Sequence, residues 1–137
     1  MRQTFSTLIV YLIIVFTPTS ILFAFEEGHT SPLPPCVVMT HCARVDLEVN
    51  NAKESFHKAL EVIASNPRTE IIDQNDSYIH AKVTTRWMHY VDDIEIKALP
   101  KNNLLEIRSE SRVGITDLGV NKKRIADISN RLTRLDN

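Results

Sequence analysis

Apolar and polar residues alternate in four segments of the second two thirds of the chain. Residues 43–49, 78–85, 91–98 and 104–111 place apolar side chains two positions apart with polar ones between them. This spacing predicts strands with one apolar and one polar face. A fifth strand, residues 70–73, is expected because the turn residues Asn75 and Asp76 would join it to 78–85 as a hairpin.

One register explains the segments 91–98 and 104–111 together. Across a loop of residues 100–103, it places Ala98, Ile96, Lys97 and Glu95 opposite Leu105, Ile107, Glu106 and Arg108. The apolar residues then meet on one face, and both charged pairs are of opposite sign on the other face. A shift by one residue would bury the charges, so we predict this register.

Two segments have helical spacing. Their apolar stripes are Phe56, Leu60 and Ile63 in the first, and Ile125, Ile128, Leu132 and Leu135 in the second. Asn51 stands at the N-cap position of the first helix with Glu54 three residues later, and Asn66-Pro67 ends it. Asp117 or Asn121 can cap the second. The pattern predicts an α+β fold, a mostly antiparallel sheet of about five strands with two helices packed on one face.

The N-terminal residues predict export. Arg2 is followed by an apolar run over residues 5–25, and no further charge appears until Glu26. This layout is typical of a secretory signal peptide, and the run would also span a bilayer if it were not cleaved. We expect a periplasmic or cell-envelope protein with residues 1–25 as signal peptide or membrane anchor, and both alternatives stay open.

Residues 26–41 are Pro-rich and predict an extended linker before a single domain over residues 42–135. Cys36 and Cys42 lie six positions apart here. An oxidising compartment would allow a disulfide between them, and two unpaired thiols are the alternative. We expect no metal site, since zinc needs more ligands than this spacing offers.

The charge excludes one class of partner. The 137 residues carry a net charge of −1, which gives no electrostatic footprint for nucleic acid. The sequence also contains no G-x-S-x-G nucleophile motif and no Gly-rich phosphate loop. We therefore predict no catalytic residue and no cofactor.

Polar residues gather between residues 91 and 124. Asp92, Asp93 and Glu95 could act as an acid/base pair or ligate a metal, but alternation puts Asp93 and Glu95 on the polar face and turns Asp92 inward. The structural alternative is that Glu95 pairs with Arg108, and that Asp92 anchors Arg112, Arg124 or backbone donors.

Two further features allow a binding role. Residues 86–90, RWMHY, contain the only tryptophan, and they are either the edge of the core or a platform for sugar or lipid. Lys122, Lys123 and Arg124 lie in the first turn of the second helix, the unfavourable end for the helix dipole. They indicate acidic neighbours, such as Asp92, Asp93 or Asp117, or an anionic ligand.

Three strings carry a family resemblance: Tyr78-Ile-His80-Ala81, Val91-Asp92-Asp93-Ile-Glu95, and RSESRVGITDLGVNKKR over residues 108–124. Over roughly residues 42–132 the chain resembles the domain of unknown function 1499 family. The resemblance implies a domain behind an export or membrane segment and supplies no activity. It marks ten polar positions as candidate ligand-binding residues: Asp92, Asp93, Glu95, Arg108, Ser109, Ser111, Arg112, Asp117, Asn121 and Arg124.

These observations favour a non-enzymatic, exported or membrane-anchored envelope module. Its partner would be a small anionic ligand or an envelope protein, contacted by a polar sheet face made of Tyr78, His80, Lys82, Glu95, Arg108 and Arg112. The alternative is a small hydrolase or metal-assisted enzyme that uses Asp92, Asp93 and Glu95 with Arg112.

Overall fold

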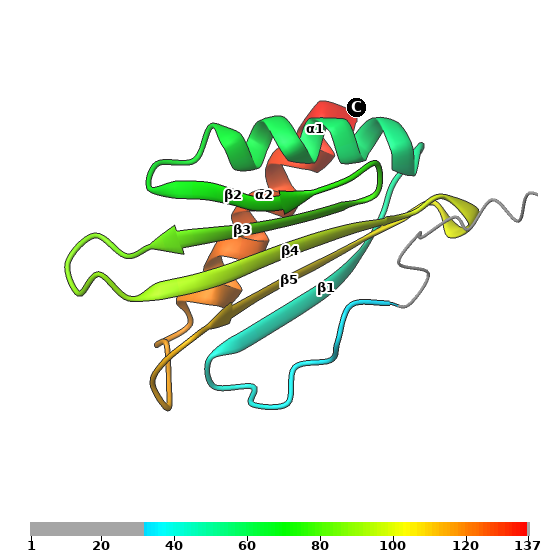
Figure 1. Cartoon of the computed structure of the whole chain (residues 1–137). Helices are drawn as coiled ribbons and strands as arrows, with labels where there is room; N and C mark the ends of the chain where they lie inside the picture. The colour runs from blue at the N-terminus through cyan, green and yellow to red at the C-terminus, as the bar shows by residue number, and fades with distance from the viewer. Residues whose placement is uncertain (1–31, 137) are drawn as a thin grey trace, which may run out of the picture.

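The computed structural model describes residues 32–136, and the apolar segment 5–25 lies outside them (Figure 1). Five strands form one sheet in the order β1-β5-β4-β3-β2, and every neighbouring pair is antiparallel. The strands are β1 (Cys42–Glu48), β2 (Thr69–Gln74), β3 (Tyr78–Thr84), β4 (Val91–Leu99) and β5 (Leu104–Ser111). The predicted α+β class and antiparallel sheet are confirmed.

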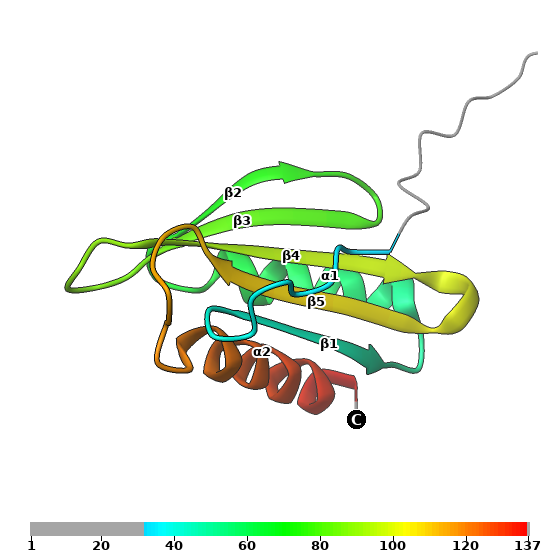
Figure 2. The ribbon, with the colours of Figure 1, turned by 90° about the horizontal axis from the view of Figure 1, so that it is seen from below.

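Two helices, α1 (Ala52–Ala64) and α2 (Val120–Asp136), lie on the same face of the sheet (Figures 1 and 2). Between them and the sheet lies the core, whose largest fully buried apolar side chains are Phe56, Ile63, Ile79, Ile94, Ile96, Leu105, Ile107, Ile128 and Leu132. Within residues 32–136, no helix has the length and apolar character needed to cross a membrane.

The β4–β5 hairpin has the predicted register. Ile96 pairs with Ile107 and Glu95 with Arg108, and the short helix Pro100–Asn102 forms most of the loop. Asn103 closes this loop in the left-handed region, at φ 51°. Alternation therefore fixes which side chains face the helices and which form the opposite, polar face.

The helix boundaries follow the expected caps. Asn51 Oδ1 accepts hydrogen bonds from the backbone N–H groups of Lys53 and Glu54, at 3.1 and 3.2 Å. At the other end of the chain, the predicted stripe is wrong at Leu135, which is half exposed. The last turn of α2 is instead fixed by polar contacts, because Asp136 bonds Ser55 and Lys58 of α1.

Residues 32–41, expected as part of a linker, pack against the polar face of the sheet (Figure 2). Leu33 is buried, its N–H donates to Glu106 Oε2 at 2.7 Å, and its carbonyl accepts from Arg44. A disulfide joins Cys36 to Cys42 at the start of β1. The segment is thus tied to the domain at both ends.

Candidate functional site

The ten candidate residues separate into two groups on opposite faces of β4 and β5. Five side chains lie between the sheet and α2, three from the strands and two from the helix, and form what we call the buried cluster: Asp92, Ser109, Ser111, Asn121 and Arg124. Four lie on the other face and, with Tyr78, His80 and Glu110, form what we call the polar-face lattice: Asp93, Glu95, Arg108 and Arg112. The tenth, Asp117, precedes α2. Alternation along β4 and β5 makes this division unavoidable for the strand residues.

An ion pair organises the buried cluster. Arg124 Nη2 donates to Asp92 Oδ2 at 2.7 Å, and Asp92 is only 1% exposed. The other guanidinium nitrogen of Arg124 donates to Ser109 Oγ at 3.0 Å. Of the partners considered for Asp92 from the sequence, Arg124 is therefore the one that binds its carboxylate. A buried carboxylate needs such a partner because burial alone would strongly disfavour its charge.

Asn121 links this pair to the N-terminal segment. It is fully buried, its Oδ1 lies 2.6 Å from Ser109 Oγ, and its Nδ2 donates to Ser111 Oγ at 2.9 Å and to the His41 carbonyl at 3.0 Å. Asn121 lies inside α2, so it does not cap the helix. Its amide instead joins β5, α2 and the start of β1.

Asp117 is the cap of α2. Its carboxylate accepts hydrogen bonds from the backbone N–H groups of Gly119 and Asn121, at 2.8 and 2.7 Å. Burial acts to raise the pKa of Asp117, but these backbone donors outweigh it and the pKa lies below its usual value. The carboxylate therefore stays charged at the positive end of the helix dipole.

Ion pairs connect the polar-face lattice. Arg112 donates to both oxygens of Asp93 at 2.8 Å, and His80 Nε2 lies 2.8 Å from the same carboxylate. Arg108 Nη1 and the Tyr78 hydroxyl donate to the two oxygens of Glu95, each at 2.8 Å. The predicted Glu95–Arg108 pair is thus present. The Tyr78 hydroxyl occupies the other oxygen of Glu95.

Burial and charge both act on this face. Burial of the Tyr78 ring and the carboxylate of Glu95 raise the pKa of Tyr78 well above its usual value. Burial also acts to raise the pKa of Asp93, but hydrogen bonds from Arg112 and His80 outweigh it and lower the pKa. Both groups therefore hold one protonation state at neutral pH.

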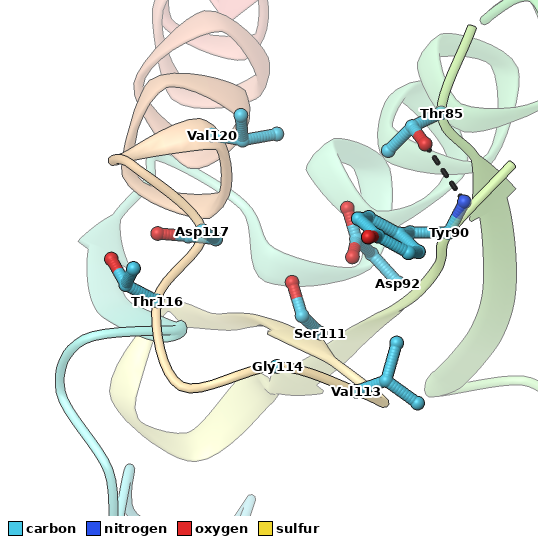
Figure 3. Close-up of a pocket in the computed structure, with 9 residues that line it drawn as sticks. All are labelled: Thr85, Tyr90, Asp92, Ser111, Val113, Gly114, Thr116, Asp117 and Val120. Atoms are coloured by element: carbon cyan, nitrogen blue, oxygen red, sulfur yellow. Dashed lines mark hydrogen bonds between the residues drawn. The ribbon is translucent and has the colours of Figure 1, made fainter. Parts of the chain in front are cut away.

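A cavity of about 320 Å³ lies where β3, β4 and β5 meet the start of α2 (Figure 3). It is lined by Thr85, Tyr90, Asp92, Ser111, Val113, Gly114, Thr116, Asp117 and Val120. Figure 3 shows these residues around one common space. The structure thus brings three of the ten candidates, Asp92, Ser111 and Asp117, to one concave surface.

Sequence reasoning missed most of this lining. Thr85, Thr116 and Val120 were not selected, and Tyr90 was noted only as part of the aromatic segment 86–90. Their shared signal is position, since each lies just beyond the end of a strand or at the start of α2. That signal becomes readable only when the strand order is known.

The three clustered acidic residues do not converge. Asp92 faces the helices, while Asp93 and Glu95 lie on the polar face and each accepts from an arginine. Among residues 32–136, no group of three or more His, Cys, Asp or Glu side chains is placed to hold a metal ion. All three carboxylates are thus already hydrogen-bonded to arginines of the domain.

Fold and site together define a small α+β domain with a cavity at one end of an antiparallel sheet. Residues 30–132 match the family described as Protein of unknown function (DUF1499), and the chain belongs to this family. The resemblance seen in the sequence is confirmed. The comparison with curated proteins finds no match.

Proposed function

We propose that this chain is a non-enzymatic ligand-binding module of the cell envelope and that the cavity at the end of the sheet is its binding site. The observation that carries the proposal is the convergence of Asp92, Ser111 and Asp117 on one cavity of about 320 Å³. Concave sites of this size with a few convergent polar groups are typical of small-molecule binding. The envelope location rests on the signal-like residues 1–25.

The lining favours a neutral ligand that carries hydroxyl groups. Hydroxyl groups of Thr85, Tyr90, Ser111 and Thr116 and the carboxylates of Asp92 and Asp117 supply donors and acceptors. The Tyr90 ring and two valines add apolar contact, as a sugar or polyol requires. No Lys or Arg is among these lining residues, and Arg124 is already paired with Asp92, so the lining offers an anion no cation of its own. We therefore propose a neutral ligand in preference to the anionic ligand expected from the sequence.

Binding is favoured over catalysis by the contacts of the carboxylates. Asp92 is held by Arg124, and Asp117 is occupied by the N-terminus of α2. The hydrolase alternative needs Asp92, Asp93 and Glu95 to act together with Arg112. Their separation onto two faces of the sheet supports the binding role instead.

The cavity is a better candidate for ligand binding than the polar face. On the polar face, Asp93 and Glu95 already accept from Arg112, His80, Arg108 and Tyr78. A ligand there would have to displace ion pairs that the domain makes with itself. In the cavity, the hydroxyl groups of Tyr90 and Thr116 offer contacts that cost less to rearrange.

Thermal unfolding of the full chain with a panel of neutral sugars and polyols, inorganic anions and amines tests the proposal. A ligand that binds only the folded state raises the midpoint. We expect a neutral hydroxylated compound to raise it by several degrees in the wild type. The shift should be lost in Tyr90→Leu and Thr116→Val, which alter the cavity lining.

Thr84→Val is the matched control, because Thr84 lies on β3 outside the cavity. It should respond as the wild type does. If the cavity variants show the same midpoint shift as the wild type, the compound binds outside the cavity. If only anions raise the midpoint, the proposed ligand chemistry is wrong. Chemical conversion of a stabilising compound, followed by NMR, would favour the enzyme alternative.

A further inference from the structure

Exposed apolar side chains concentrate at one end of the domain. Of the twelve large apolar side chains exposed among residues 32–136, ten lie in residues 36–41, 85–90 and 112–120. We call these three segments the loop end. Six of the ten are Val37, Met39, Trp87, Met88, Ile115 and Leu118. The other two of the twelve, Ile72 and Leu135, lie on β2 and near the end of α2.

Strand pairing brings the three segments together. Cys42 pairs with Glu110, Ser111 with Asp92, and Val91 with Thr84. The segments that precede β1, connect β3 to β4 and follow β5 therefore lie at the same end of the sheet. Figures 1 and 2 show the β3–β4 and β5–α2 loops at this end.

Main-chain bonds and the disulfide hold the loop end in shape. The N–H of Asp117 donates to the Thr40 carbonyl at 3.0 Å, and the N–H of Arg112 donates to the Val91 carbonyl at 3.1 Å. The Cys36–Cys42 disulfide closes the first segment. The apolar side chains are thus presented on an organised surface.

These side chains do not serve the core of the domain. Trp87, Ile115 and Leu118 are 81%, 87% and 91% exposed. Leu118 also adopts a left-handed backbone, at φ 54°, which is unfavourable for a residue with a side chain. Exposed apolar side chains gathered at one end of a domain in this way mark interaction surfaces. Their partner must therefore be apolar where it meets the loop tips.

Basic residues outnumber acidic ones in the loop end and the adjoining first turn of α2. Residues 36–41, 85–90 and 112–123 contain Arg86, Arg112, Lys122 and Lys123 against a single acidic residue, Asp117. The carboxylate of Asp117 is directed to the backbone N–H groups of Gly119 and Asn121. Apolar and aromatic tips accompanied by an excess of basic residues match an anionic bilayer, whose headgroups attract the charges while the interface accepts tryptophan.

We propose that the loop end docks on an anionic membrane surface and inserts Trp87, Ile115 and Leu118 into the interface. The positive first turn of α2 then faces lipid phosphate, which accounts for the lysines at the unfavourable end of the helix dipole. The three inserted side chains do not line the cavity, but most of the cavity lining belongs to the loop end, so docking would place the cavity next to the membrane surface.

Trp87 reports on docking directly, because it is the only tryptophan of the chain. The full chain is mixed with vesicles of phosphatidylcholine alone or with phosphatidylglycerol added. Emission of Trp87 is then followed, together with its quenching by lipids brominated on the acyl chains. In anionic vesicles we expect emission at shorter wavelength and strong lipid quenching. This readout concerns the loop itself, whether or not residues 5–25 hold the chain in the bilayer.

Variants separate the two contributions. Ile115→Ser with Leu118→Ser should lower the docked-to-undocked ratio on the order of tenfold or more, because apolar burial is lost. Lys122→Glu with Lys123→Glu should remove the preference for anionic vesicles. The matched control, Ile72→Ser with Leu135→Ser, removes the two exposed apolar side chains outside the loop end and should leave Trp87 quenching unchanged.

Three results would overturn the proposal. The first is that Trp87 stays accessible to an aqueous quencher in the presence of anionic vesicles. Another is equal quenching with and without phosphatidylglycerol. The third is a blue shift on raising the protein concentration without vesicles, which would show that a second copy of the chain covers the loop end. Circular dichroism of each variant verifies that the domain is folded.

Discussion

Two neighbouring aspartates of β4, Asp92 and Asp93, have the same side chain but lie in different environments. Asp92 accepts a hydrogen bond from Arg124, and Asp93 accepts two from Arg112. Asp92 is 1% exposed, whereas the Asp93 and Arg112 side chains are 22% and 46% exposed. One step along the strand therefore separates a buried ion pair from one at the surface.

The difference teaches which contacts the fold depends on. A buried pair is barely favourable as a whole, yet removal of one partner leaves a charge without water or counter-ion. A pair in contact with solvent loses little, because water replaces the missing partner. The family-like positions thus combine residues that the fold cannot lose with residues that it can, and substitutions can sort them.

The largest effect is expected at Arg124. Arg124→Met leaves Asp92 buried without a cation, and we expect a loss of about 3–5 kcal/mol in the free energy of unfolding. Urea denaturation measures it. The double variant Asp92→Leu with Arg124→Met removes both charges and should be more stable than Arg124→Met alone.

Arg131→Met is the control for loss of an arginine from α2. Arg131 bonds Ser65 and Asn66 and does not contact the buried cluster. Its effect should be much smaller. If Arg124→Met cost no more than this control, Asp92 would have access to water and the cluster would not be a structural centre.

Alternation and capping explain why so much of this fold was predictable. The register of Ile96 with Ile107 and Glu95 with Arg108 depends on the local pattern of apolar and charged residues. The residues that follow Asn51 identify it as the N-cap of α1. The same alternation predicted that Asp92 would be separated from Asp93. Each of these features depends on residues close in sequence or on one hairpin.

Features that depend on distant segments were not predictable in the same way. Leu33 is buried only because the segment before β1 crosses the polar face and meets Glu106 on β5. The cavity needs the ends of β3, β4 and β5 to lie beside the start of α2. Arg124 was one of several candidate partners for Asp92, since the spacing alone did not orient α2. Strand order and helix docking supplied the missing information.

An intermediate effect is expected at Asp117, which lies between the two environments. Asp117→Ala removes the cap of α2 and should lower the free energy of unfolding by about 1 kcal/mol. Asp117→Asn keeps an acceptor oxygen and should lose less. Thermal or urea unfolding at neutral pH compares the three proteins. Equal losses in both variants would show that the charge, and not the acceptor, stabilises the helix start.

The smallest effect is expected at Arg112, and its signature is in pH. The pKa of Asp93 is lowered in the folded state because hydrogen bonds from Arg112 and His80 outweigh burial. The folded state thus binds the proton less readily than the unfolded chain, whose aspartate pKa is about 3.9. The stabilisation is present above that value and is lost as the pH falls through the lower folded pKa.

Arg112→Ala should raise the pKa of Asp93, as measured by NMR titration of its carboxyl carbon, and make stability less dependent on pH in the acid range. At neutral pH the loss should be far below that of Arg124→Met, because Arg112 is in contact with water. Lys58→Ala, which removes a cation paired with Glu54 and Asp136 on the helix side of the domain, serves as the control and should leave the Asp93 pKa nearly unchanged. A loss at neutral pH as large as that of Arg124→Met would mean that water does not replace the guanidinium, so the lattice would act as a second core.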